Sequence, residues 1–145
     1  MKSMVVCSAS FAALMSLVSP HARGQTDAVQ QYMATRPDLI LCAAYSVSQT
    51  DSLRQELIGR KLLTDTDLKM LAKKTVYNGM SECGLLASYR IPQSIEITPK
   101  YQVLETPVDI AYHYKESVDH PRPLDIYFKG GTIILVMEEL TINLR

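Results

Sequence analysis

The spacing of apolar and polar residues along the chain changes near Pro92. Before this residue, apolar positions recur at the three- and four-residue spacing that is typical of helices. After it, apolar and polar residues alternate, as they do in half-buried strands. The first residues differ from both, because Met4 to Val18 is an uncharged and mostly apolar run. These patterns divide the sequence into a leader, a helical part and a sheet part.

Start and stop signals predict several helices before Pro92. They cover about residues 26–34, 37–48, 51–59, 65–77 and 82–91. The second of these is apolar nearly all round, so we expect it to be buried on all sides. The clearest start is Thr64, a capping residue with acids in the turn that follows it. The apolar stripe from Leu68 continues to Val76, which predicts a helix that ends only at Asn78-Gly79.

Alternating residues after Pro92 predict an antiparallel sheet. The expected strands are Ile95 to Ile97, Val108 to Tyr114, Leu124 to Phe128 and Thr132 to Met137. Gly130-Gly131 is a two-residue hairpin turn between the last two. The last strand is more continuously apolar, so it is expected to be covered on both faces. In the second strand, the inward residues are Val108, Ile110, Tyr112 and Tyr114, and the outward residues are Asp109, Ala111, His113 and Lys115.

This order of elements predicts an α+β fold. N-terminal helices are followed by a three- to four-stranded antiparallel sheet, and the helices pack on one face of it because an apolar sheet face needs a cover. The 145 residues have room for one ordinary domain. We divide the chain into a leader of residues 1–24, a helical extension of residues 25–60 and an α+β domain of residues 61–145.

The leader has the organisation of a signal peptide. Lys2 makes its start positive, and the apolar run that follows is shorter than the roughly 20 residues of a membrane span. Small residues at Ala22 and Gly24 fit cleavage after Gly24. An uncleaved N-terminal anchor is the alternative. We therefore expect a periplasmic or secreted protein whose mature chain has no membrane span.

Charge and cysteine content fit export. Removal of the leader leaves 13 basic residues against 15 acidic ones, so the mature net charge is about −2 and does not favour nucleic-acid binding. Cys7 lies in the leader and is not preceded by the small residues of a lipoprotein site. Cys42 and Cys83 remain, and an even pair in an oxidising compartment predicts a disulfide. Two cysteines so far apart, without a nearby histidine, make a poor metal site.

Four motifs between about Lys61 and Glu138 are similar, in their order, to those of a known family. They are a glycine-methionine-serine turn at Gly79-Met80-Ser81, a helix that ends shortly before a proline at Leu85 to Pro92, an aromatic strand at Asp109 to Tyr114, and a hairpin at Tyr127 to Gly131. Together they resemble the BamE/SmpA-like family of small outer-membrane assembly proteins.

This resemblance implies two helices on a three- or four-stranded antiparallel sheet, without catalysis, in a periplasmic binding or assembly module. A protein inhibitor of β-lactamases shares the implied fold. The chain departs from the family at Arg90-Ile91, where a glycine usually precedes the proline. It also lacks the tryptophan of the aromatic strand and the lipidation cysteine. The N-terminal helices and the cysteine pair are additions.

No nucleotide loop, nucleophile elbow or metal motif is present, so we expect neither catalysis nor a cofactor. An enzyme would need Asp119, His120 and Arg122 of the proline-rich loop to converge on a pocket. The eight tyrosines, against two phenylalanines and no tryptophan, favour a sheet core edged by hydroxyls. Tyr112, Tyr114 and Tyr127 offer contact area for a partner as the alternative.

The predicted function is a non-enzymatic module that binds another envelope protein or assists envelope assembly. Its binding surface is expected on the outward sheet face and the last hairpin, because a mixture of polar and aromatic residues suits a modest interface. The candidate binding residues are Asp109, His113, Lys115, Tyr127 and Lys129. The alternative is an inhibitor or immunity factor against an envelope-acting enzyme, and the sequence leaves the oligomeric state open.

Overall fold

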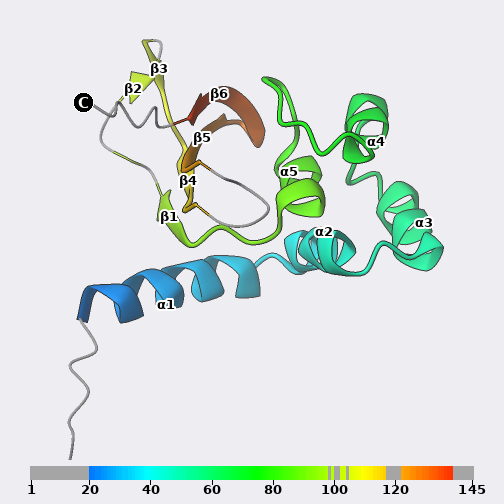
Figure 1. The fold of residues 1–145 in the computed structure, drawn as a ribbon, viewed down its shortest axis with the longest axis horizontal. Helices are drawn as coiled ribbons and strands as arrows, with labels where there is room; N and C mark the ends of the chain where they lie inside the picture. The colour runs from blue at the N-terminus through cyan, green and yellow to red at the C-terminus, as the bar shows by residue number, and fades with distance from the viewer. Residues whose placement is uncertain (1–19, 98, 100–101, 104, 117–121, 139–145) are drawn as a thin grey trace, which may run out of the picture.

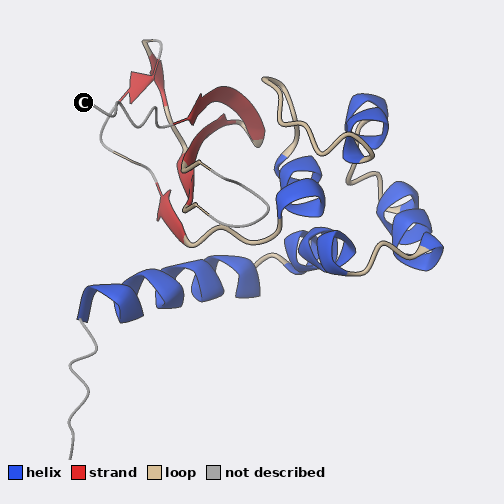
Figure 2. Cartoon of the chain, viewed as in Figure 1, coloured by secondary structure: helices blue, strands red, loops and turns tan. Residues whose placement is uncertain are grey.

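The computed structural model describes residues 20–97, 99, 102–103, 105–116 and 122–138 (Figure 1). Within these residues, five helices precede a four-stranded antiparallel sheet, which confirms the α+β class (Figure 2). The helices are α1 Pro20–Ala34, α2 Pro37–Val47, α3 Asp51–Gly59, α4 Asp65–Leu71 and α5 Glu82–Tyr89. Most of the leader, together with Asp119 and His120 of the proline-rich loop, lies outside the described residues.

The sheet is a meander with one insertion. Its strands are β1 Ser94–Ile97, β4 Ile110–Tyr114, β5 Leu124–Lys129 and β6 Thr132–Glu138, in the spatial order β1-β4-β5-β6. A separate two-stranded hairpin of β2 Gln102–Val103 and β3 Thr106–Pro107 is inserted between β1 and β4, and the sequence patterns did not predict it. Gly130 and Gly131 have φ values of 57° and 76°. These values confirm the predicted two-residue hairpin turn, which requires a left-handed backbone conformation at both positions.

Local capping residues begin the helices as predicted. The Thr64 Oγ1 accepts a hydrogen bond of 3.0 Å from the Asp67 backbone N–H, and the Asp67 carboxylate accepts one of 2.9 Å from the Thr64 N–H. Thr50 caps α3 through the Leu53 N–H, and Ser81 caps α5 through the Gly84 N–H. These bonds satisfy N–H groups that have no partner within a helix.

The predicted end of α4 is wrong. The helix ends at Leu71 instead of continuing past Val76, and Lys74 takes a left-handed φ of 48°. The chain reverses here because the Tyr77 hydroxyl donates a 2.6 Å hydrogen bond back to the Asp67 carboxylate, which a continued helix would carry it away from. Lys73 and Lys74 therefore follow the helix instead of lying within it.

The expectation that α2 is buried on all sides is also wrong. Leu39, Cys42 and Ala43 face the core, whereas Ile40 is 48% exposed and Val47 is 74% exposed. The reason is that α2 packs mainly against α5, with α1 and α3 at its ends, so one stripe of the helix has no cover. An apolar helix surface is consequently presented to solvent.

One face of the sheet packs against the helices, as predicted. Tyr112, Ile126 and Phe128 are fully buried there, in one cluster with Leu57 of α3 and Leu85 of α5. In Figure 1, α1 runs beneath β1, and α5 lies between the sheet and the other helices. The alternation of Leu124, Ile126 and Phe128 is thus correctly predicted. The helices and the sheet share one main core.

The opposite face has a small core of its own, which the alternation did not predict. Val108, Ala111 and Tyr127 are buried together, with Val103 of the β2–β3 hairpin packed against them. Val108 was expected on the helix side, but it precedes β4, so the alternation of that strand does not apply to it. A bulge opposite Tyr127 and Phe128 interrupts β6. That strand is not covered on both faces, since its Met137 is 50% exposed.

Candidate functional site

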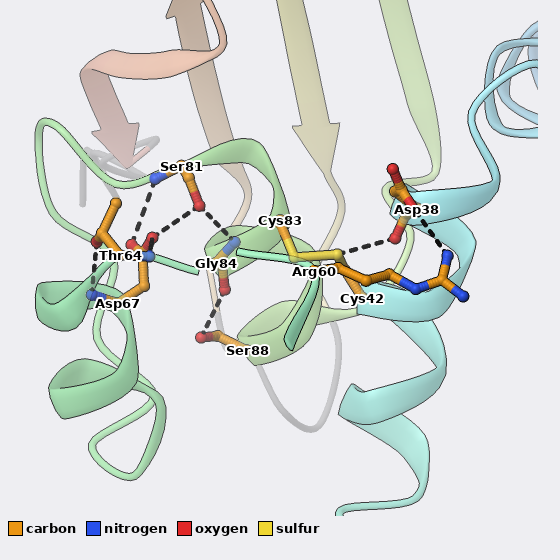
Figure 3. The surroundings of a disulfide bond; sticks show 9 residues. All are labelled: Asp38, Cys42, Arg60, Thr64, Asp67, Ser81, Cys83, Gly84 and Ser88. Carbon is orange, nitrogen blue, oxygen red and sulfur yellow. Dashed lines mark hydrogen bonds and ion pairs between the residues drawn. A yellow bond between two sulfur atoms is a disulfide. The ribbon is translucent and has the colours of Figure 1, made fainter. Parts of the chain in front are cut away.

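Cys42 of α2 and Cys83 of α5 form a disulfide, which confirms the predicted pair (Figure 3). Their Cα atoms are 5.3 Å apart and the residues are 41 positions apart in sequence. A distance of this size is within the range that a disulfide spans. The bond attaches the helical extension to the helix that supports the sheet.

Two of the predicted binding residues bind each other at the last hairpin. The Lys129 ammonium donates to the Asp109 carboxylate at 2.8 Å, and the Gly130 backbone N–H donates to the same group at 2.7 Å. The hydrogen bond from Lys129, followed by the one from Gly130, lowers the pKa of Asp109 below its ordinary value. These exposed charges brace the turn, and an exposed pair of this kind contributes little to stability.

The other polar candidates are separated along the sheet. The Nδ1 of His113 lies 2.7 Å from the Asp125 carboxylate on the neighbouring strand, and both side chains are about one-third exposed. Lys115 is exposed just after β4, where its backbone N–H donates to the Gln93 side chain. The structure therefore divides the candidates between two places instead of gathering them in one patch.

The expectation that Tyr127 is an exposed anchor is wrong. Its side chain is 9% exposed and packs beside Val108 and Ala111. Burial, followed by the charge of Asp125, raises the pKa of its hydroxyl. The residue is covered because the β2–β3 hairpin folds over this part of the sheet, and no alternating pattern signals that hairpin. Tyr112 and Tyr114 are likewise core residues, as the favoured interpretation of the tyrosines predicted.

The turn that precedes α5 is held against the last hairpin. Gly79 has a φ of 92°, and its N–H donates to the Ile133 carbonyl at 2.6 Å. The Ile133 N–H donates to Met80, and the Glu82 N–H donates to Gly131. Only glycine adopts such a φ without strain, so Gly79 has a physical role in the turn. The Gly79-Met80-Ser81 turn is thus a contact between the helices and the sheet.

Asp67 is a fully buried carboxylate beside this turn. Besides the Thr64 N–H and the Tyr77 hydroxyl, it accepts hydrogen bonds from the Ser81 hydroxyl at 2.7 Å and the Ser81 N–H at 3.3 Å. Burial alone raises the pKa of Asp67, but the bonds from Tyr77, Thr64 and Ser81 outweigh it and leave the pKa below its ordinary value. Neutral donors therefore stabilise the charged form.

Gly84 makes this arrangement possible. A Cβ at this position would lie 2.7 Å from the Asp67 side chain, a distance that requires displacement of one of the two. Figure 3 shows Gly84 between Asp67 on one side and the disulfide on the other. The glycine therefore allows α4 and α5 to approach closely.

Glu82 is a second buried carboxylate, 8% exposed, at the first position of α5. It accepts hydrogen bonds from the hydroxyls of Tyr32, at 2.7 Å, and of Tyr112. The Arg36 guanidinium lies 3.3 Å from its other oxygen. Burial first, and then the interactions with Glu82, raise the pKa of both tyrosines, so both hydroxyls stay protonated and donate. Sequence reasoning missed this site, because an acid in a first helical turn indicates only a dipole interaction.

Four consecutive residues thus connect most of the molecule. Ser81 and Gly84 meet α4 through Asp67, Cys83 is bonded to α2, and Glu82 joins α1 and β4 through Tyr32 and Tyr112. Both carboxylates are surrounded by protein donors. This arrangement fixes the packing of the helices on the sheet, and a binding surface has to be sought elsewhere.

The exposed stripe of α2 borders a hollow that we call the α2 groove. Its volume is about 480 Å³, and its lining residues are Ile40, Ala43, Ala44 and Val47 of α2 with Arg90 and Ile91 of the α5–β1 connection. Arg90 has a left-handed φ of 72°. The carbonyl of Arg90 accepts a 3.0 Å hydrogen bond from the Tyr114 hydroxyl, which fixes this strained backbone.

The described residues contain no group of three or more histidine, cysteine or carboxylate side chains placed to hold a metal ion. None of the helices that the structure describes has the length and apolar character needed to cross a bilayer. No family model matches the chain, and no curated protein or solved structure is significantly similar to it.

Proposed function

We propose that the mature protein is an exported, non-enzymatic binding module that holds an apolar segment of another envelope protein in the α2 groove. The observation that carries the proposal is the exposure of three aliphatic side chains around one hollow. Ile40, Val47 and Ile91 are 48%, 74% and 45% exposed. Contiguous apolar surface of this kind is typical of interaction sites.

The chemistry of the groove indicates what its partner carries. Aliphatic side chains and two alanines line it, and Arg90 is the charged residue among them. A segment with adjacent aliphatic side chains and a nearby carboxylate complements this surface. The proposal places the interface here instead of on the outward sheet face, because Tyr127 is buried and Asp109 pairs with Lys129.

Export is part of the proposal. The leader has the signal-peptide pattern, and the Cys42–Cys83 bond is compatible with an oxidising compartment. Cleavage after Gly24 would remove the first five residues of α1. The buried α1 residues Val29, Tyr32 and Met33 follow that point, so the mature chain keeps their contacts with the main core. A role in envelope assembly, as in the BamE/SmpA-like family, is our preferred form of this function.

Site-specific photo-crosslinking tests the groove. A photo-reactive amino acid at Val47, in the periplasm of living cells, is expected to give a discrete adduct with one envelope protein. The same amino acid at Gln55, an exposed position on α3 outside the groove, is expected to give none. Ile91→Asp should abolish the Val47 adduct because it puts a charge into the apolar contact.

A matched variant separates binding from folding. Ile58 is an exposed isoleucine of α3 outside the groove, so Ile58→Asp should leave the Val47 adduct unchanged. Both variants should retain the melting temperature of the wild type to within a few degrees, since exposed substitutions have small effects. Equal adducts from all three proteins would remove the groove from the proposed function. Mass spectrometry of the mature chain should find Gln25 as its first residue.

A further inference from the structure

A second hollow is lined by residues of α2, α3, α4 and α5 and of the segments that adjoin them. Figure 1 shows how these four helices are arranged. The hollow has a volume of about 190 Å³. The lining residues are Tyr45 of α2, Gln49 of the connection to α3, Arg54 of α3, Leu68 and Leu71 of α4, Ala72 just after α4, and Ala87 of α5. We call it the helical cleft. It shares no lining residue with the α2 groove, so the inference below is independent of the proposed function.

The lining of the helical cleft is divided by chemistry. Leu68, Leu71 and the two alanines give it apolar walls, and the small alanine side chains leave its space unfilled. Tyr45, Gln49 and Arg54 bring a hydroxyl, an amide and a guanidinium, all of which can donate hydrogen bonds. No carboxylate is among the lining residues. The cleft therefore combines an apolar body with several donors and one positive charge.

Arg54 lies within α3 and differs from Arg60, the arginine that caps the end of this helix. Arg60 pairs with Glu56 at 2.6 Å and with Asp38 at 3.1 Å. For Arg54, in contrast, the structure records no ion pair with any residue that it describes. An exposed arginine needs no partner by itself, but here Arg54 lines a hollow together with Leu68 and Leu71. Planar guanidinium groups bind carboxylates through paired hydrogen bonds.

We propose that the helical cleft binds a carboxylate attached to a short, branched apolar body. The apolar part would contact Leu68 and Leu71, and the carboxylate would accept hydrogen bonds from Arg54 and the Tyr45 hydroxyl. The volume is below the 300–1,000 Å³ or so of typical cofactor sites, which favours a ligand of about one residue in size. A free branched acid and the C-terminal residue of a protein chain both have this chemistry.

Binding of defined probes to the full mature protein tests this site. The probes are N-acetyl-leucine and a tetrapeptide that ends in leucine, each compared with its C-terminal carboxamide in calorimetric titrations. We expect the acids to bind at least about tenfold more tightly than the amides, because the charge-assisted bonds are lost with the charge. Equal affinity of acid and amide would overturn the proposal.

Variants locate the binding. Arg54→Gln should weaken the acids at least about tenfold and leave the amides unchanged. Arg60→Gln removes the same charge from the end of the same helix, outside the cleft, and should change neither. Ala72→Leu should also weaken the acids, with Arg54 in place, because its side chain fills the cleft. Wild-type affinity in Arg54→Gln, or NMR shift changes by the acids away from Tyr45, Leu68 and Leu71, would refute the site.

The two probes also separate the sources of the ligand. Tighter binding of the tetrapeptide than of N-acetyl-leucine would identify a chain end, since residues before the carboxylate would then add contacts. Equal binding would identify a free acid. Either result supports a carboxylate site, provided that the acids bind more tightly than their amides.

Discussion

The two buried carboxylates, Asp67 and Glu82, lie on either side of the start of α5 and are satisfied in different ways. The donors to Asp67 all come from residues 64–81, so its partners are near in sequence. The donors to Glu82 come from α1, the α1–α2 connection and β4, and two of them are 50 and 30 positions away. Asp67 therefore shapes a local turn, whereas Glu82 holds distant elements together.

The two sites also differ in charge compensation. Asp67 is fully buried and receives only neutral donors, whereas Glu82 has the half-exposed Arg36 beside it. A carboxylate can stay charged in either setting if its hydrogen bonds are complete. The start of one short helix is thus anchored by a local and a long-range network at once, with the Cys42–Cys83 bond between them.

Removal of the disulfide should have the largest effect, because it removes the covalent link between α2 and α5 and leaves only non-covalent contacts between them. The double variant Cys42→Ala/Cys83→Ala should lose about 4 kcal/mol of unfolding free energy, on a chain-entropy model for a loop of 41 residues. Chemical denaturation of the oxidised protein and the variant measures the difference. A reductant should destabilise the wild type only, and a variant as stable as the oxidised protein would contradict the estimate.

Asp67→Ala should have the next largest effect. It leaves the donors of Tyr77, Ser81 and Thr64 without their acceptor and removes the capping box of α4. We expect a loss of about 3 kcal/mol in urea unfolding. Asp65→Ala, in the same first turn but exposed, is the control and should lose less than about 1 kcal/mol. Equal losses of unfolding free energy in the two variants would mean that the buried hydrogen bonds of Asp67 contribute no stability beyond its interaction with the helix dipole.

Glu82→Ala should lower the unfolding free energy by somewhat less, about 2 kcal/mol, although Glu82 bonds to more distant elements than Asp67 does. The hydroxyls of Tyr32 and Tyr112 lose their acceptor, but the half-exposed Arg36 can turn to water. Glu82→Gln keeps one acceptor oxygen and should lose less than Glu82→Ala. Hydrogen exchange should show which contacts loosen, with protection reduced in α1 and β4 by Glu82→Ala and near α4 by Asp67→Ala. The opposite pattern would reverse the comparison.

Alkaline pH should give the smallest effect and should distinguish the two sites. Burial, followed by the hydrogen bond to Asp67, raises the pKa of Tyr77 to about 12. Because the folded pKa is above the ordinary value of about 10, this contribution is complete below pH 10 and is lost as the pH rises toward 12. The stability difference between the wild type and Tyr77→Phe, about 1 kcal/mol at neutral pH, should shrink over that range.

The matching measurement uses Tyr32→Phe in the Glu82 network. The pKa of Tyr32 is raised further than that of Tyr77, through burial and then through Glu82. The stability differences of Tyr32→Phe and Tyr77→Phe should therefore decline together from about pH 10, and that of Tyr32→Phe should go on declining above pH 12, where that of Tyr77→Phe levels off. Levelling off of both differences at the same pH would show that the two tyrosines share one environment.

The amino-acid sequence by itself determined the elements whose causes are local. Thr50, Thr64 and Ser81 cap their helices through N–H groups within three residues, and Gly130-Gly131 turns the last hairpin. The alternation in Leu124 to Phe128 correctly gave the inward face of β5, and the cysteine count gave the disulfide. The caps, the turn and the alternation depend on residues within a few positions of one another. The disulfide follows from the number of cysteines in the mature chain.

Tertiary structure alone decided the rest. The end of α4 depends on Tyr77 reaching back to Asp67, the burial of Tyr127 depends on an inserted hairpin, and the role of Glu82 depends on Tyr32 and Tyr112. The exposed side of α2 likewise follows from which elements happen to cover it. The physical reason is common to all four: hydrophobic periodicity states that a residue can be buried, but the partner that buries it or bonds to it is set by chain topology. Both proposed binding sites are lined by segments that are distant in the sequence, and they exist only because of that packing.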